Sequence, residues 1–202
     1  MMIANCTALI LAGGESRRMG QDKASLMLGE HTLLLHVASA LQPLFADIII
    51  STRKHRSNCD FQQVIDNPLH HGPLAGLAAG LEQAKTPWVF AVACDMPFIS
   101  AQLIKYLSEF RDDYDAVVPV VEGYPQPMAA FYARGSLNTL RDTMNDGESH
   151  SMRELLDRLK VHYVNEDKIR AAGHAMQSFF DLDTPQDIAM ALNMKKVKQW
   201  NI

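Results

Sequence analysis

Short hydrophobic runs alternate with amphipathic segments along most of the chain. Runs of apolar, β-forming residues predict strands, and they cover residues 7–11, 47–51, 64–65, 88–93, 116–120, 129–132 and 161–164. Between them, apolar residues recur at helical spacing over 32–41, 73–84, 100–110, 137–144 and 152–159. A last helix is expected from Thr184-Pro185, because proline is tolerated at the first helical position.

Strands that are apolar on both faces and alternate with helices indicate a sheet covered on both sides. We therefore predict an α/β fold, a three-layer, Rossmann-like and mostly parallel sheet with helices on both faces. No repeat and no linker rich in Pro, Gly or Ser interrupts the pattern. One domain is expected over residues 1–202.

Composition and charge exclude several classes of protein. The 202 residues carry 23 acidic and 19 basic side chains, a net charge of -4, which argues against a nucleic acid or an anionic membrane as partner. Three cysteines without a CxxC pair fit a reducing cytoplasm. The first residues resemble a strand more than a signal peptide, and no window approaches the roughly 20 apolar residues of a membrane span.

The densest chemical signal is the stretch from Leu11 to Lys23, LAGGESRRMGQDK, directly after the first predicted strand. Two successive glycines let backbone N–H groups approach a ligand, and Arg17, Arg18 and Lys23 supply positive charge for phosphate oxygens. No Ser or Thr follows the lysine, so this is not a Walker A loop. We interpret it as a cradle for a triphosphate.

A second candidate is Asp95, at the carboxyl end of the strand predicted over 88–93. Ligands of open parallel sheets bind beyond the carboxyl ends of the strands, so Asp95 is expected to face the same crevice as the glycine loop. A carboxylate beside a triphosphate most simply holds Mg²⁺. Helix capping is the alternative role for this acid.

The pattern LAGGxSRRMGxDK resembles the signature of the molybdenum cofactor guanylyltransferases (MobA-type proteins), nucleotidyltransferases with a Rossmann-like sheet. The similarity extends through GPLAG at 72–76, ACDMP at 93–97 and DTP at 183–185. The resemblance implies a nucleotide-binding half of about 1–120 and a pterin-substrate half of about 121–202. It implies Mg²⁺, which Mn²⁺ can replace.

The resemblance also implies roles for individual residues. Catalysis is expected from Arg18, Lys23 and Asp95, with Asp95 on the metal. The GTP site is expected to comprise Leu11, Ala12, Gly13, Lys23, Ser51, Asp66, Gly72, Pro73, Leu74, Gly76 and Asp95.

Two positions need separate comment. Ser51 stands where the family pattern commonly has an asparagine, and a hydroxyl cannot offer the two-sided amide. By strand alternation Asp181 and Asp183 are expected on one face. Asp181 is a candidate second metal contact, and Asp183 is expected to cap the last helix.

The leading hypothesis is transfer of GMP from GTP to molybdopterin, with or without molybdenum, forming the guanine dinucleotide cofactor and pyrophosphate. Other molybdenum cofactor biosynthesis proteins and acceptor molybdoenzymes are expected partners. A molybdopterin cytidylyltransferase, or a sugar or alditol nucleotidyltransferase of the same fold, is the nearest alternative. A non-catalytic nucleotide-binding regulator is the alternative of another class, and the presence of both Lys23 and Asp95 argues against it.

Overall fold

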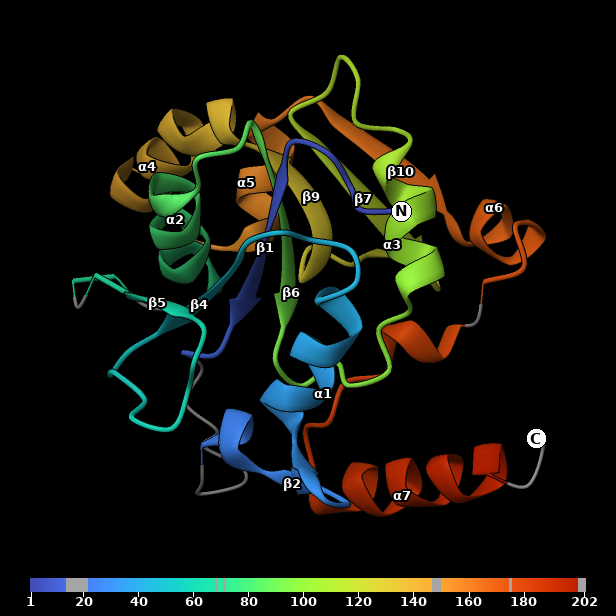
Figure 1. Ribbon diagram of the computed structural model, residues 1–202. Coiled ribbons are helices and arrows are strands. Elements are labelled where there is room, and N and C mark those ends of the chain that lie inside the picture. The colour runs from blue at the N-terminus through green and yellow to red at the C-terminus, as the bar shows by residue number, and fades with distance from the viewer. Residues whose placement is uncertain (14–21, 68, 71, 147–149, 175, 200–202) are drawn as a thin grey trace.

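The computed structural model describes residues 1–13, 22–67, 69–70, 72–146, 150–174 and 176–199. Within these ranges the central sheet has eight strands, in the order β10-β7-β9-β6-β1-β4-β5, with β8 paired to β7 (Figure 1). The strands are β1 (Cys6–Leu11), β4 (Ile48–Thr52), β5 (Gln62–Ile65), β6 (Trp88–Ala93), β7 (Ala116–Val121), β8 (Tyr124–Pro125), β9 (Ala129–Ala133) and β10 (Val161–Asn165).

The sheet is mostly parallel, as predicted. Strands β6, β1, β4 and β5 run parallel, and so do β7 and β10, whereas β9 is antiparallel to both β6 and β7. Strands β7 and β8 are joined by Glu122 and Gly123, whose φ angles of 51° and 80° suit the two-residue turn of a hairpin. Since β9 runs backwards, Met128 precedes its start at the edge where β6 ends, and its carbonyl accepts a hydrogen bond from the Ala93 N–H at 3.0 Å.

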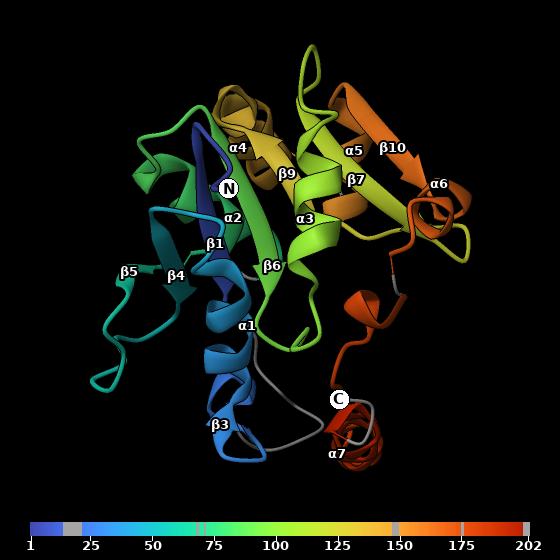
Figure 2. The same cartoon turned by 45° about the vertical axis from the view of Figure 1, so that its right-hand side comes forward.

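Helices cover both faces of the sheet (Figures 1 and 2). On one face lie α1 (Leu33–Leu41), α3 (Ala101–Ser108) and α6 (Glu166–Ala171), and on the other α2 (Pro73–Gln83), α4 (Leu137–Asp146) and α5 (Met152–Arg158). The Ser100 hydroxyl caps α3 as expected by accepting from the Leu103 N–H, but this helix ends at Ser108, two residues before the predicted end. The predicted three layers are therefore confirmed.

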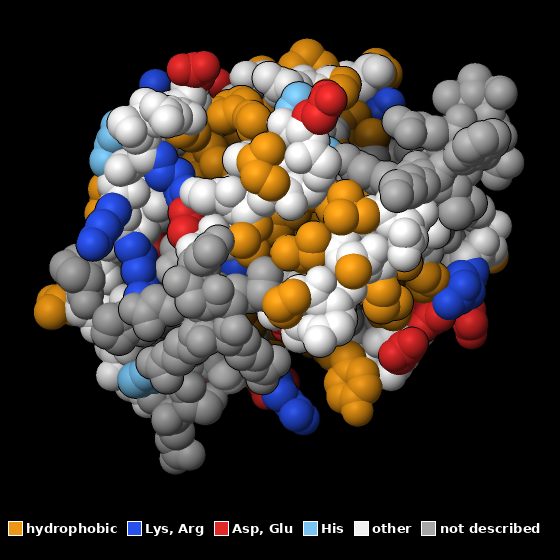
Figure 3. All heavy atoms as spheres, turned by 90° about the horizontal axis from the view of Figure 1, so that it is seen from below, with side chains coloured by type: hydrophobic (Ala, Val, Ile, Leu, Met, Phe, Trp, Pro, Cys, Tyr) orange, Lys and Arg blue, Asp and Glu red, His pale blue; other side chains and the backbone are white. Residues whose placement is uncertain are grey.

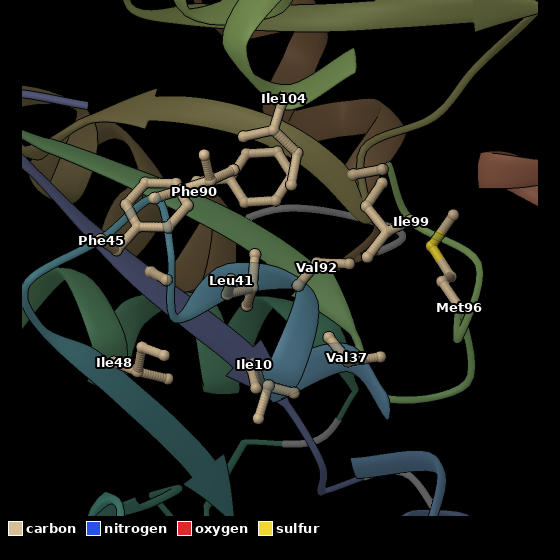
Figure 4. Close-up of a cluster of buried hydrophobic side chains, with 14 of the residues drawn as sticks. Ile10, Val37, Leu41, Phe45, Ile48, Phe90, Val92, Met96, Ile99 and Ile104 are labelled. Carbon is tan, nitrogen blue, oxygen red and sulfur yellow. The ribbon is translucent and has the colours of Figure 1, made fainter. Parts of the chain in front are cut away.

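The first layer of the core is built on β1 and β6 (Figure 4). Every residue of β1 is buried. Phe90 of β6 stacks on Phe45 with ring centroids 5.9 Å apart and lies 4.8 Å from the Phe131 ring of β9. Each such buried side chain contributes roughly 1.5–3 kcal/mol to folding, so the strand ends that carry the functional side chains rest on a rigid support.

A smaller unit packs below the sheet in Figure 1. It consists of the turn η1 (Lys23–Ser25), a hairpin of β2 (Met27–Leu28) and β3 (His31–Thr32), and α7 (Pro185–Gln199). Buried Leu28, Leu182 and Ala191 form its core with Leu33. Seen from below, the molecule exposes hydrophobic side chains (Figure 3). Within this unit, Met27 and Met190 are exposed.

The start of α7 corrects the sequence analysis. The hydroxyl of Thr184 accepts from the Asp187 N–H at 3.3 Å, while the Asp187 carboxylate accepts from the Thr184 N–H at 2.7 Å. This reciprocal pair is a capping box, so Thr184 and not Asp183 caps the helix. Residues 180–183 form no strand, which also removes the expected strand face for Asp181 and Asp183.

Four kinds of element were not predicted. They are the β2–β3 hairpin, the two-residue strand β8, the six-residue helix α6 and the 3₁₀ turns η1, η2 (Arg134–Ser136) and η3 (Met176–Phe179). All are too short to give a periodic signal. Within the described residues, no helix combines the length and the hydropathy that crossing a bilayer requires.

Candidate functional site

A pocket of about 220 Å³ lies where β1, β4 and β6 end and α2 begins. It is lined by Leu11, Ala12, Gly13, Asp22, Lys23, Ser51, Asp66, Gly72, Pro73, Gly76, Ala93, Cys94, Asp95 and Met128. This is the place where open parallel sheets bind ligands. The predicted nucleotide-binding residues line it with the exception of Leu74.

Two predicted residues need a separate statement. The side chain of Leu74 is 1% exposed and packs in the hydrophobic core under α2, so only its backbone is available for binding. The expectation that Leu74 contributes to the GTP site therefore stays a prediction for its backbone, because its side chain faces the core in the first turn of α2. Arg18 lies outside the described residues.

Lys23 lies between two carboxylates at one end of the pocket. Its Nζ donates to Asp95 Oδ2 at 2.7 Å and to Asp183 Oδ1. Burial alone would lower the pKa of this ammonium, but the carboxylates of Asp183 and Asp95 outweigh it and raise the pKa above its ordinary value. Lys23 is therefore a cation at neutral pH. Its side chain links the start of η1 to the segment after β6 and to the segment before α7.

Asp181 lies at the rim of this cluster. It is exposed and is not part of the pocket lining. Partial desolvation, followed by the negative charges of Asp183 and Asp95, raises the pKa of Asp181. Of the two acids that precede α7, Asp183 is thus the one that meets Lys23, which the sequence analysis did not foresee.

Asp66 and Ser51 form a second polar cluster on the pocket wall. The buried Ser51 hydroxyl donates to Asp66 Oδ1 at 2.5 Å. Burial raises the pKa of Asp66, although the Ser51 hydrogen bond and the charge of Arg53 oppose that shift. Ser51 was expected to meet the nucleotide directly, but its single donor is already committed to orienting Asp66.

The N-terminus of α2 opens onto the pocket near Asp66. Gly72 precedes the helix with φ of 80°, a conformation that favours glycine, and no side chain of the described residues caps the helix there. The first backbone N–H groups of the helix are therefore available to a ligand acceptor. A Cβ on Gly76 would lie 2.5 Å from Ser51 Oγ and 2.7 Å from Leu11 Cδ2, so this glycine is needed for close packing of α2 on β1 and β4.

Sequence reasoning missed four further residues of the pocket lining, Asp22, Ala93, Cys94 and Met128. Asp22 carried a usable signal, because an aspartate just before a short turn is a typical cap, and its carboxylate does accept from the Ala24 N–H at 3.2 Å. Burial raises the pKa of the Cys94 thiol to about 12, so Cys94 is neutral and serves as an apolar wall.

The donor set at Lys23 fits a hard divalent cation. Asp95 and Asp183 present carboxylate oxygens to one point, which Lys23 Nζ holds. In the described part of the chain, no three metal-ligating side chains gather as a cation site. Mg²⁺ commonly uses one or two carboxylates and takes its other ligands from substrate phosphates and water.

Comparison with known proteins agrees with this geometry. The family model described as "MobA-like NTP transferase domain" matches residues 8–163. The "Probable molybdenum cofactor guanylyltransferase" of Pelotomaculum thermopropionicum is 34% identical over 200 residues, which cover 96% of this chain and 97% of that protein.

Two solved structures are similar to the fold. "Molybdopterin-guanine dinucleotide biosynthesis protein A" from Archaeoglobus fulgidus has a TM-score of 0.83 at 26% identity, covering 94% of this chain and 98% of that one. A 2-C-methyl-D-erythritol 4-phosphate cytidylyltransferase from Thermus thermophilus has a TM-score of 0.72 at 20% identity, covering 97% and 100%. The second likeness concerns the fold alone. Together with the pocket, the family match and the identity to the Pelotomaculum protein establish that this chain is a nucleotidyltransferase and belongs to the MobA-like NTP transferase family.

Proposed function

We propose that this protein transfers GMP from GTP to the phosphate of molybdopterin and releases pyrophosphate. The observation that carries the proposal is the arrangement of Lys23, Asp95 and Asp183 at one end of a pocket whose other wall holds Asp66 and the open N-terminus of α2. The charged end suits a triphosphate, and the wall with a carboxylate and backbone N–H groups suits a base. The similarity to guanylyltransferases over nearly the whole chain supports the choice of substrates.

The reaction follows from the chemistry of the substrates. An oxygen of the pterin phosphate attacks the α-phosphorus of GTP in line with the bond to the β-phosphate oxygen. The new P–O bond joins the two substrates, and pyrophosphate leaves with the electrons of the broken bond. No covalent intermediate on the protein is required, so the chain contributes position and charge.

Lys23 supplies the charge at the phosphate end. Its ammonium is held by two carboxylates and is always protonated, so it offers a fixed positive charge near the oxygens that become more negative as pyrophosphate leaves. Arg18 is proposed to assist Lys23 on the phosphates, since it belongs to the same motif.

Asp95 and Asp183 are the residues that we propose to hold Mg²⁺ or Mn²⁺. When bound, such a cation would neutralise negative charge on the phosphates. Both carboxylates are also ion-paired to Lys23, so a bound cation would share them with its ammonium. Asp181, at the rim, remains a candidate for a further contact through water.

Asp66 and α2 are proposed to read the base. Guanine presents N1–H and an amino group as donors and O6 as an acceptor. The Asp66 carboxylate, held by Ser51, can accept from the donors, and free N–H groups of the first turn of α2 can donate to O6. A base that leaves these groups unpaired should be rejected.

The division of the chain is part of the proposal. Residues of about 1–120 carry the nucleotide pocket, and residues of about 121–202 are proposed to receive the pterin. Met128 lines the pocket beside Ala93 and marks the side from which the second substrate would approach. Met128 and Asp183 both come from the second half and still belong to the nucleotide site, since Met128 lines the pocket and Asp183 contacts Lys23 of the first half.

The test is a nucleotide panel. The protein is incubated with molybdopterin, Mg²⁺ and each of the four nucleoside triphosphates, and released pyrophosphate is measured. We expect kcat/KM for GTP to exceed that for ATP and CTP by at least about a hundredfold, equivalent to roughly 2.7 kcal/mol. A preference for CTP would overturn the base assignment, and binding of GTP without pyrophosphate release would favour the regulator.

A further inference from the structure

Arg56 lies in the segment between β4 and β5 and contacts Ala12 and Asp22, near the two ends of the predicted triphosphate cradle at residues 11–23. Its guanidinium pairs with the Asp22 carboxylate, with Nη1–Oδ2 and Nη2–Oδ1 distances of 2.6 and 2.8 Å. Nη2 also donates to the Ala12 carbonyl at 3.3 Å, and Nη1 donates to Ser25 Oγ at 3.2 Å. Ala12 and Asp22 stand on either side of segment 14–21 in the sequence, so one side chain fixes the distance between them.

Asp22 connects this contact to Lys23. Besides pairing with Arg56, its carboxylate accepts from the Ala24 N–H at 3.2 Å and from Ser25 Oγ at 2.8 Å, which closes the turn η1. Lys23 is the first residue of that turn. A shift of Asp22 would therefore move η1, and Lys23 with it, relative to Asp95.

Arg56 is itself held by the sheet. Its backbone N–H donates to Gln63 Oε1 at 2.8 Å, and its carbonyl accepts from Gln63 Nε2 at 2.9 Å. Gln63 belongs to β5, which pairs with β4. The Arg56 side chain is only 18% exposed, and it extends from a backbone that the Gln63 amide holds through two hydrogen bonds.

We propose that Arg56 is a positioning residue for nucleotidyl transfer, which ties Ala12 to Asp22 and thereby holds Lys23 at the phosphate end of the pocket. The inference rests on the proposed function. Arg56 does not line the pocket, and its two terminal nitrogens are engaged by the contacts above. It therefore acts through Asp22 and Lys23 and not on the substrate.

A double-mutant cycle tests this role. The variants are Arg56→Met, Asp22→Asn and the two combined, with Arg141→Met as the matched control. Arg141 pairs with Glu82 at 2.6 Å far along α2 from the pocket lining, so its loss removes an ion pair of similar length. A displaced Lys23 would meet the triphosphate less well in the bound ground state as well as in the transition state. We therefore expect each single variant at Arg56 or Asp22 to lower kcat/KM by about tenfold, mostly through a raised KM for GTP, and the double variant to be no less active than the less active of the two single variants.

The KM–kcat split separates positioning from a merely structural role. Partial unfolding reduces the active fraction, which lowers kcat and leaves KM unchanged. Losses that multiply to about a hundredfold in the double variant would overturn the proposal, and so would wild-type KM in a folded Arg56→Met protein. Arg56→Lys keeps the charge but cannot contact Ala12 and Asp22 at the same time, so its KM for GTP should lie between the values of the wild type and of Arg56→Met.

The cycle remains informative if the base assignment is wrong. It is run with whichever triphosphate gives the fastest pyrophosphate release in the wild type, so a preference for another base changes the nucleotide and not the expected coupling. Pyrophosphate release from none of the four would overturn the proposed function and the role of Arg56 together. Should Arg56→Met fail to fold, a wild-type KM in Arg56→Lys would overturn the inference.

Discussion

Replacing Lys23 by methionine should turn the phosphate end of the pocket into a site that binds a divalent cation without nucleotide. In the wild type the ammonium neutralises Asp95 and Asp183. Methionine fills a similar volume but carries no charge, so the two carboxylates would face each other unpaired. The variant should be less stable than the wild type and should regain stability when a cation is supplied.

The size of the effect follows from the exposure of the three side chains. Removing one partner of a buried pair costs about 3–5 kcal/mol. Lys23 and Asp95 are 18% and 16% exposed, but Asp183 is 45% exposed, so its share is screened by solvent. We expect a loss of about 2–3 kcal/mol, which for a chain of this size lowers Tm by about 5–10 °C.

The assay is thermal unfolding with and without Mg²⁺ or Mn²⁺. A cation at ten times its Kd adds RT ln 11, about 1.4 kcal/mol, or roughly 3–5 °C in Tm. The wild type should respond less, because its own ammonium competes for the carboxylates.

Arg141→Met is the control, since it breaks an exposed ion pair with Glu82 outside the pocket lining. Its unfolding should show no added response to cations. The reasoning would be refuted by a Lys23→Met protein with the Tm of the wild type, or by equal responses of Tm to Mn²⁺ in the two proteins. Pyrophosphate release by Lys23→Met should fall by orders of magnitude in either case.

Three further predictions follow from the contacts described. Asp66→Asn should hold or raise Tm at pH 7. Burial raises the pKa of Asp66, so its protonated carboxyl stabilises the fold: this contribution is fully present below the pKa of the unfolded state and is lost as the pH rises through the pKa of the folded state. A GTP titration should show weaker binding, and a Tm difference between variant and wild type that does not depend on pH would contradict the assignment. Gly76→Val should weaken GTP binding far more than Ser51→Ala, because a Cβ at position 76 would lie 2.5 Å from Ser51 Oγ and push α2 away from the pocket. Equal Kd values of the two variants for GTP in calorimetry would contradict this. Thr184→Ala should cost about 1 kcal/mol through the lost cap and lower Tm by about 2–4 °C with KM for GTP unchanged.

Most of the layered fold could be predicted because each main strand and helix has a strong local pattern. The direction of β9 could not. It depends on the hairpin turn at Glu122-Gly123, where glutamate adopts a positive φ that residues of its type rarely show. Hydrophobic alternation is the same in a parallel and an antiparallel strand, so the pattern over 129–132 does not indicate in which direction β9 runs relative to its neighbours.

The residues of the candidate site also fall into those that the sequence predicted and those that it did not. Leu11 to Gly13, Lys23 and Asp95 belong to motifs that are continuous in the sequence, and they line the pocket as expected. Asp183 was assigned to the helix cap because Thr184-Pro185 gives a local capping signal, whereas its partner Lys23 lies 160 positions earlier. Arg56 gave no signal at all, since its partners are set by the path of the β4–β5 connection.

The pairing of Lys23 with Asp183 also bears on the order in which the molecule is completed. During synthesis the N-terminal strands and β6 leave the ribosome long before residue 183, and contacts between distant residues are the slowest to close. The sheet and its pocket can thus fold while the phosphate end still lacks one carboxylate. Leu182 then anchors the late segment, with its N–H donating to the Asp95 carbonyl at 3.0 Å and its side chain fully buried. A nascent chain would therefore hold a shaped pocket but an unfinished reaction centre, and turnover would begin only after the C-terminal segment docks.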